Sequence, residues 1–185
     1  MPLQVHPDIR SLSPYVPGKP IDELQRELGL TRIIKLASNE NPLGPSPKAV
    51  AALSGAQDTL HRYPDGGAYQ LRRALADRWK VTQERVILGN GSDEIIGLLA
   101  RTFLAPGDEA VMADHTFVIY KMEVTAVHGR PVIVPLVNWT HDLESMVQAL
   151  TPRAGLLFLC DPNKPTGTMV TADAVERVVA RVPDD

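Results

Sequence analysis

Short apolar runs alternate with helix-like segments along the chain from residue 46 onward. The runs at 86–88, 110–113, 132–134 and 156–159 are continuously apolar, which is typical of strands buried on both faces. The segments between them carry apolar side chains at helical spacing, at 69–79, 92–99, 117–127, 143–150 and from Thr171 onward. Repeated strand–helix units of this kind predict an α/β fold, in which helices cover both faces of a mostly parallel sheet in three αβα layers.

The first 45 residues have a different pattern. Prolines interrupt the segment before residue 21, among them Pro7, Pro14, Pro17 and Pro20. We expect no regular structure there until a short helix at 21–28, which Gly29 stops, followed by a strand at 33–36. The breakers at 42–45 then exclude both helix and central strand. We therefore divide the chain into an N-terminal arm, residues 1–45, and a regular region, residues 46–185.

The regular region opens on two helices with clear signals. Ser46 is followed by Pro47, which is the pattern of an N-cap and a first helical proline, and this helix should stop near Gly55. The segment 69–79 carries Leu71, Leu75 and Trp79 at helical spacing. This pattern predicts an amphipathic helix with one apolar face.

The segment 86–96 indicates a site for an anion. The apolar run 86–88 should end a buried strand, Gly89 and Gly91 allow a tight turn, and Ser92 or Asp93 can cap the helix that follows. The first N–H groups of such a helix are unpaired, so they can bind a phosphate. The segment lacks the Lys-Ser or Lys-Thr of a P-loop, and Glu94 stands where a dinucleotide fingerprint needs glycine or alanine. An ordinary strand-to-helix turn remains the alternative.

The loops that follow residues 88, 113 and 160 should meet at one edge of the sheet, because parallel strands carry ligand sites at their carboxyl ends. Phe117 and Tyr120 offer aromatic faces there, and Asn163 and Lys164 offer hydrogen-bond donors. The alternatives are that Phe117 joins the core and that 161–167 is a proline-rich turn. Asparagines 39 and 41 can contact a substrate or simply form Asx turns.

Composition narrows the function classes. The 185 residues are 44% hydrophobic and 22% charged, with a net charge of -3, which is typical of a soluble globular protein and argues against a nucleic-acid surface. We see neither a signal peptide nor an apolar run of membrane-spanning length, and the single cysteine, Cys160, suits a cytoplasmic location. No catalytic Ser-His-Asp or Cys-His set can be argued. We expect no metal site, because no metal-ligand spacing joins the histidines, which are His6, His61, His115, His128 and His141.

Four ordered motifs carry a resemblance to a known family. They are Leu-Ala-Ser-Asn-Glu-Asn-Pro-Leu-Gly at 36–44, Arg-Tyr-Pro-Asp at 62–65, Gly-Ser-Asp-Glu at 91–94 and Asp-Pro-Asn-Lys-Pro-Thr-Gly at 161–167. In this order and spacing the chain resembles the histidinol-phosphate aminotransferases, which are fold-type-I pyridoxal-phosphate enzymes. The resemblance covers nearly the whole chain. It implies an arm and small-domain segment at 1–45 and the first part of the cofactor-binding large domain at 46–185.

The resemblance assigns the cofactor contacts. Gly91, Ser92 and Asp93 match the segment that holds the phosphate of pyridoxal phosphate, and Phe117 matches the aromatic residue that stacks on its ring. Asn163 and Lys164 belong to the loop beside the ring, but the family usually has asparagine where this chain has Lys164. A lysine can still donate to the ring's phenolic oxygen, although it adds a charge and flexibility.

The resemblance also assigns contacts outside the cofactor-binding half. Tyr63 matches a tyrosine that reaches the cofactor phosphate of the neighbouring subunit, which implies a homodimer. Tyr15, Asn39, Glu40 and Asn41 match the segment that lines the substrate pocket. The family's Schiff-base lysine, and the aspartate that pairs with the pyridine nitrogen, come later than Asp185, so we assign no catalytic residue in this chain.

The implied reaction is transfer of an amino group between glutamate (or 2-oxoglutarate) and imidazole-acetol phosphate or histidinol phosphate, in histidine biosynthesis. Because the chain is expected to lack the lysine, we expect it to be inactive alone. One alternative is a phosphate-ester amino-acid decarboxylase on the same fold. The other is a non-catalytic, truncated gene product.

Overall fold

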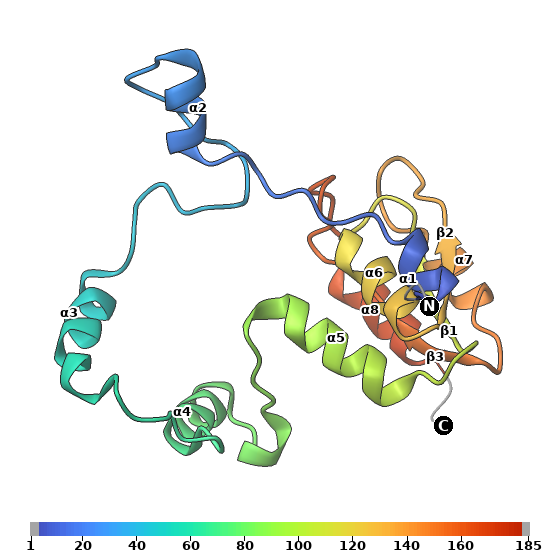
Figure 1. Ribbon diagram of the computed structural model, residues 1–185. Coiled ribbons are helices and arrows are strands. Elements are labelled where there is room, and N and C mark those ends of the chain that lie inside the picture. The colour runs from blue at the N-terminus through green and yellow to red at the C-terminus, as the bar shows by residue number, and fades with distance from the viewer. Residues whose placement is uncertain (1–3, 183–185) are drawn as a thin grey trace. The chain divides into compact units, whose positions relative to one another are not determined.

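The structure, a computed structural model, describes residues 4–182 (Figure 1). Their internal contacts divide them into two compact units. The first unit contains residues 4–13 and 87–182, and the second contains residues 14–86. Among the residues described, no helix is both long and apolar enough to cross a bilayer. These units are defined by their internal contacts, so they do not test the predicted boundary between residues 45 and 46, which stays a prediction.

The first unit is built on a three-stranded parallel sheet. Its strands are β1 (Glu109–Ala113), β2 (Arg130–Val134) and β3 (Ala154–Leu157), in the order β2-β1-β3. Val111 of the central strand pairs with Val132 on one side and with Leu157 on the other. All five residues of β1 are buried, as expected for a strand covered on both faces.

Helices cover both faces of this sheet. On one face α5 (Gly91–Phe103) and α6 (Val118–Ala126) pack against each other, and Ala100 and Val124 join Met112 of β1 in the core. On the other face α7 (Leu143–Gln148) brings Met146 against Val111 of β1. Helix α8 (Ala172–Val179) packs on α7. Alternate residues of β1 thus serve opposite faces, and the predicted parallel α/β architecture is confirmed.

The second unit contains helices whose ends follow the sequence signals. They are α2 (Ile21–Leu28), α3 (Pro47–Gly55) and α4 (Tyr69–Trp79), with the short 3₁₀ helices η1 (Gln57–Thr59) and η2 (Gln83–Arg85). Helix α2 stops because Gly29 adopts the left-handed conformation, and α3 starts with proline at its first position. The predicted limits of these three helices are confirmed.

Two predicted strands are wrong. Residues 33–36 are irregular, and residues 86–88, of which Val86 has an extended backbone, form no strand in the described part of the chain. Val86 is buried, whereas the neighbouring Ile87 is exposed. An apolar run becomes a strand only when a neighbour accepts its backbone hydrogen bonds, and here the sheet consists of β1, β2 and β3.

One helix was not predicted. Residues Pro7–Ser11 form α1, because Pro7 sits at the start of the helix and the His6 imidazole accepts the Asp8 N–H as an N-cap. The prediction that Pro7 interrupts regular structure is wrong, because proline is well tolerated in the first turn, where its missing N–H has no partner to lose. Helix α1 packs on α6 within the first unit.

Candidate functional site

The loops after β1 and β3 meet through one side chain, that of Asn163. Its Nδ2 donates to the carbonyl oxygen of His115 at 3.0 Å and to Thr166 Oγ1 at 2.8 Å. Asn163 is only 2% exposed, although its loop is largely on the surface. The predicted convergence of these two loops is therefore present, and Asn163 ties them together.

Phe117 and Lys164 lie against each other in the same region. Phe117 is the N-cap residue of α6, and Lys164 Nζ stands 4.4 Å from the centre of its ring. Phe117 also contacts Tyr120 edge to face, at 5.7 Å between centroids, and Tyr120 stacks on Phe158 at 4.5 Å. Burial raises the pKa of the Tyr120 phenol. This aromatic row joins the core to the site and holds the Phe117 ring beside a cation.

A small hollow of about 270 Å³ lies at the carboxyl end of β1 beside Phe117. Asp114, His115, Lys121 and Pro165 are among the residues that line it. The predicted site did not include Asp114, His115 or Lys121, although the first two directly follow the predicted strand. The position of Asp114 and His115 directly after a strand was the signal that could have identified these two residues.

The Asp114 carboxylate holds the loop rather than facing a ligand. Its Oδ1 accepts the N–H of His115 at 2.7 Å and that of Leu136 at 3.1 Å, and its Oδ2 lies 3.0 Å from His115 Nδ1. Burial opposes ionisation of this group, but these bonds outweigh it and lower the pKa of Asp114.

The predicted anion site lies at the N-terminus of α5. The helix begins at Gly91, whose φ of 82° lies in the left-handed region, and the N-cap side chain of Asn90 makes no hydrogen bond to the helix. The Glu94 carboxylate instead accepts the N–H of Asn90. The first-turn N–H groups of an α-helix have no intrahelical partners, so those of Ser92 and Asp93 can bind an anion. Both residues are exposed.

Two glycines precede or begin this helix, and a side chain at either position would meet resistance. A Cβ on Gly89 would come within 2.8 Å of Ile95 Cδ1, and the left-handed backbone at Gly91 disfavours any side chain. The hollow beside Phe117 is lined by other residues than Gly91, Ser92 and Asp93. The contact through Asn163 joins the loops after residues 113 and 160, whereas the convergence of the loop after residue 88 with them stays a prediction.

The remaining predicted site residues belong to the second unit. Tyr63 is fully exposed and Tyr15 is about half exposed. Glu40 forms an ion pair with Lys35, and Asn41 Oδ1 accepts the N–H of Leu43 at 3.0 Å, which is an Asx turn. Asn39 has a left-handed backbone with φ of 52°. Glu40 and Asn41 therefore both have partners within their own loop.

Comparison with known proteins gives a consistent relationship. The sequence model of the family described as aminotransferase class I and II matches residues 31–184. The histidinol-phosphate aminotransferase of Moorella thermoacetica is 54% identical over 175 residues, which are 95% of this chain and 45% of that protein. Histidinol-phosphate aminotransferase 2 of Pseudomonas aeruginosa is 50% identical over 179 residues, 96% of this chain and 48% of its own length. The chain spans about half the length of the curated relatives it matches.

Solved structures share the fold. A crystal structure of the histidinol-phosphate aminotransferase from Sinorhizobium meliloti, in complex with pyridoxal-5'-phosphate, superposes with a TM-score of 0.85 at 26% identity. The match covers 97% of this chain and 48% of that one. A second structure, of a putative histidinol-phosphate aminotransferase from Erwinia carotovora atroseptica, gives a TM-score of 0.73 at 30% identity over 79% of this chain and 43% of that one. With its parallel α/β unit and the family match over most of its length, the chain belongs to the class I and II aminotransferases.

Proposed function

We propose that this chain forms part of a pyridoxal-phosphate-dependent aminotransferase of histidine biosynthesis. The reaction is amino transfer between glutamate and imidazole-acetol phosphate, with histidinol phosphate and 2-oxoglutarate on the other side. The names of the relatives at 54% and 50% identity support this choice of substrate. The observation that carries the proposal is structural: an anion-binding helix start and an aromatic, polar loop pair stand on one compact unit.

The residues at the start of α5 fit the cofactor's phosphate. Gly91 gives the turn, and the N–H groups of Ser92 and Asp93 face outward at the positive end of the helix. The Asp93 carboxylate is exposed and can turn to solvent, so it need not oppose the phosphate. In this assignment Gly91, Ser92 and Asp93 bind and orient the phosphate group.

The loops after β1 and β3 fit the cofactor's ring. Two polar atoms there, Thr116 Oγ1 and Asn163 Oδ1, are buried without a partner among the described residues. Such atoms commonly mark a place where a bound group completes the hydrogen bonds. Phe117 offers an aromatic face, and the Lys164 ammonium, which lies 4.4 Å over its centre, would turn away from that face to donate to an oxygen of a ring stacked there.

Asn163 has a positioning role in this proposal. Both of the contacts made by its Nδ2 are to the protein, at His115 and Thr166, so its amide holds the loop that carries Lys164. Lys164 then takes the donor role that the family usually gives to asparagine. When bound, the cofactor's ring withdraws electrons from the substrate carbon that bears the amino group.

Residues of the second unit complete the proposal. The fully exposed Tyr63 is free to reach the cofactor phosphate of a neighbouring subunit, which makes the enzyme a homodimer. Tyr15, Asn39, Glu40 and Asn41 line the substrate pocket in this assignment. The Asx turn at Asn41 and the ion pair at Glu40 fix the shape of their loop.

This chain on its own should not transaminate. The reaction needs a lysine amine that holds the cofactor and a carboxylate beneath its ring. We assign neither role to a residue of this chain, and its lysines are Lys19, Lys35, Lys48, Lys80, Lys121 and Lys164. We therefore expect weak binding of pyridoxal phosphate by the chain alone, and no lysine labelled stoichiometrically after borohydride reduction.

The test joins this chain to the remaining part of the Moorella thermoacetica relative in one polypeptide. The hybrid should transfer the amino group of glutamate to imidazole-acetol phosphate. Ser92→Glu should lower the affinity for pyridoxal phosphate about tenfold or more, because a carboxylate competes with the phosphate for the same N–H groups. Thr102→Glu, near the other end of α5, is the matched control and should leave that affinity unchanged.

Three outcomes would contradict the proposal. A hybrid that binds the cofactor but decarboxylates a phosphorylated amino acid would assign a different reaction to the same site. A hybrid that folds but binds no cofactor would indicate a non-catalytic chain. Equal losses of cofactor affinity in Ser92→Glu and Thr102→Glu would show that the phosphate does not bind at the start of α5.

A further inference from the structure

Three potential metal ligands gather where α1 meets α6. They are His6, Asp8 and His128, and we call them the His6–Asp8–His128 cluster. Asp8 Oδ2 lies 3.4 Å from His6 Nδ1 and 3.0 Å from His128 Nδ1, and the two imidazole rings have centroids 4.0 Å apart. One ligand atom from each residue lies within 4.8 Å of the other two.

The fold holds these three side chains together from two distant parts of the sequence. His6 caps α1, Asp8 lies in its first turn, and α1 packs on α6. His128 follows α6, where a left-handed backbone with φ of 63° turns the chain toward β2. All three belong to the first unit, so their proximity depends on packing within one compact body.

We propose that the His6–Asp8–His128 cluster binds a divalent transition-metal ion of the Zn²⁺ class. Two imidazoles and a carboxylate are a common three-ligand set for zinc, with water in the fourth position. With metal–ligand bonds of about 2.0–2.2 Å, tetrahedral ligand atoms lie about 3.4 Å apart. The two separations from Asp8 Oδ2 to the imidazole nitrogens, 3.4 Å and 3.0 Å, are close to that value.

The hydrogen bond accepted by His6 favours this chemistry. Its Nδ1 accepts the N–H of Asp8 at 3.3 Å, so that nitrogen carries a lone pair rather than a proton. A metal would replace this long hydrogen bond by a stronger contact. Imidazole nitrogens select zinc, cobalt, nickel or copper over magnesium and calcium, which prefer oxygen ligands.

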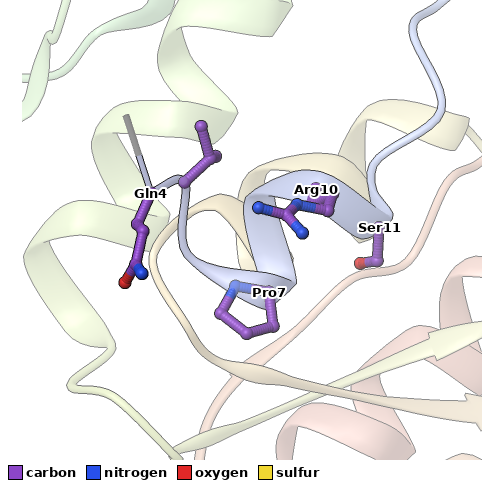
Figure 2. Close-up of a pocket in the computed structure, with 5 residues that line it drawn as sticks. Gln4, Pro7, Arg10 and Ser11 are labelled. Atoms are coloured by element: carbon purple, nitrogen blue, oxygen red, sulfur yellow. The ribbon is translucent and has the colours of Figure 1, made fainter. Parts of the chain in front are cut away.

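A second feature of α1 does not compete for the ion. Figure 2 shows Gln4, Pro7, Arg10 and Ser11 around an open hollow on this helix. The hollow is also lined by Val5, and it offers the cationic Arg10 but neither a carboxylate nor an imidazole. Of these two places on α1, the His6–Asp8–His128 cluster is therefore the one that offers ligands for a cation. Since these ligands come from both sides of the contact, the metal would fasten α1 to α6.

The test titrates the full 185-residue chain, free of any histidine tag, with ZnCl₂ in a calorimeter. We expect saturable binding of one Zn²⁺ per chain near neutral pH, and its loss near pH 5, where imidazoles are protonated. Loss of a residue that hydrogen-bonds to a metal ligand typically weakens metal binding about 10–100-fold. Because Asp8 and His128 are ligands themselves, Asp8→Asn and His128→Ala should each weaken Zn²⁺ binding by at least that factor.

The matched control is His115→Ala. His115 Nδ1 lies 3.0 Å from Asp114 Oδ2, the same separation as between His128 Nδ1 and Asp8 Oδ2. Among the described residues, however, no second imidazole joins the His115–Asp114 pair in a three-ligand cluster. Its removal should leave zinc affinity unchanged. Absence of saturable binding, or equal losses from His115→Ala and His128→Ala, would overturn the proposal.

A measurement on the unaltered chain avoids dependence on how variants fold. Substoichiometric Co²⁺, a paramagnetic probe, should broaden the imidazole NMR signals of His6 and His128 before those of His61, His115 and His141. Uniform broadening of all the histidines, or none, would refute a defined site at the His6–Asp8–His128 cluster.

Discussion

The two compact units form similar helices but bury them very differently. In the first unit Ala110, Val111 and Val124 are completely buried around a parallel sheet. In the second unit Leu36 and Leu43 are more than 90% exposed, and Ala76 and Val86 are the buried residues of its described part. Leu71 and Trp79, from the predicted apolar face of α4, are also more than half exposed.

This difference separates two causes of helix formation. Local signals such as a first-turn proline and a left-handed glycine set the ends of α2 and α3 in the second unit. Burial needs a second surface, which the sheet supplies only in the first unit. Because the second unit leaves large apolar side chains exposed, we expect the chain on its own to associate or aggregate.

Placing a charge in each unit gives the largest expected contrast. Val124→Asp puts a carboxylate in the core between α5, α6 and β1, which should cost more than about 4 kcal/mol and abolish cooperative unfolding. The matched change Val50→Asp, on α3 in the second unit, should cost less than about 0.5 kcal/mol because Val50 is exposed. Urea unfolding followed by far-UV circular dichroism measures both. Similar losses would mean that the second unit has a core of its own.

The rate of limited proteolysis should give the next largest contrast between the two units. Segments with few buried contacts open more often, so trypsin should cleave after Lys48 and Arg62 at least about tenfold faster than after Lys121 in α6. Mass spectrometry of timed samples gives the order of cleavage. Early cleavage within 109–134 would contradict the contrast in burial.

A buried carboxylate makes the first unit sensitive to acid. Glu109 accepts hydrogen bonds from Thr151 Oγ1 at 2.6 Å and Arg153 Nη2 at 3.0 Å, and Arg130 lies 3.8 Å away. The bond from Thr151, followed by that from Arg153, lowers the pKa of Glu109 below 4.5. The folded state then gains stability above that pH and loses it as the pH falls toward the lowered pKa.

Glu109→Gln should therefore lower the melting temperature at pH 7 and flatten its decrease on acidification below about pH 4.5. Glu40→Gln, which breaks an ion pair with Lys35 in the second unit, should leave both unchanged, because its carboxylate is exposed. Thermal melts at several pH values provide the comparison. An unchanged pH profile in Glu109→Gln would show that other carboxylates govern the acid response.

Helix caps give the smallest contrast. Asp142 caps α7 in the first unit by accepting the N–H of Ser145 at 3.1 Å and its hydroxyl at 2.6 Å, so Asp142→Ala should cost about 1 kcal/mol. Ser46 occupies the same position before α3 but makes no cap hydrogen bond, so Ser46→Ala should cost less than about 0.5 kcal/mol. Chemical unfolding of both variants measures the difference, and an equal cost would show that Ser46 forms its cap in solution.

The sequence was informative wherever structure depends on neighbouring residues. Pro47 and Gly29 mark helix ends correctly, and the continuous apolar run at 110–113 lies within β1. It failed where structure depends on distant partners. The apolar run at 86–88 has the composition of a strand, but it pairs with no strand among residues 4–182.

The candidate site shows the same division. The sequence predicted the glycine turn before α5 at Gly91 and the meeting of the loops after β1 and β3, because both follow from the order of elements along the chain. It could not show that Lys164 lies over Phe117, since the direction of a long side chain depends on packing. Nor could spacing reveal His128 beside Asp8, because 120 residues separate them.

The hydrogen bond from Asn163 to the carbonyl of His115 also determines where the chain tolerates added length. It joins two loops that are 48 residues apart in sequence. An insertion in either loop must displace the amide or the carbonyl and leave a buried polar group unpaired. The 135–141 connection between β2 and α7 is also tied to other loops, because the Leu136 N–H donates to Asp114 Oδ1 and Thr168 Oγ1 donates to the carbonyl of Trp139. For anyone who redesigns this scaffold, Asn163 therefore fixes the length of two loops, and these two bonds restrict the connection after β2.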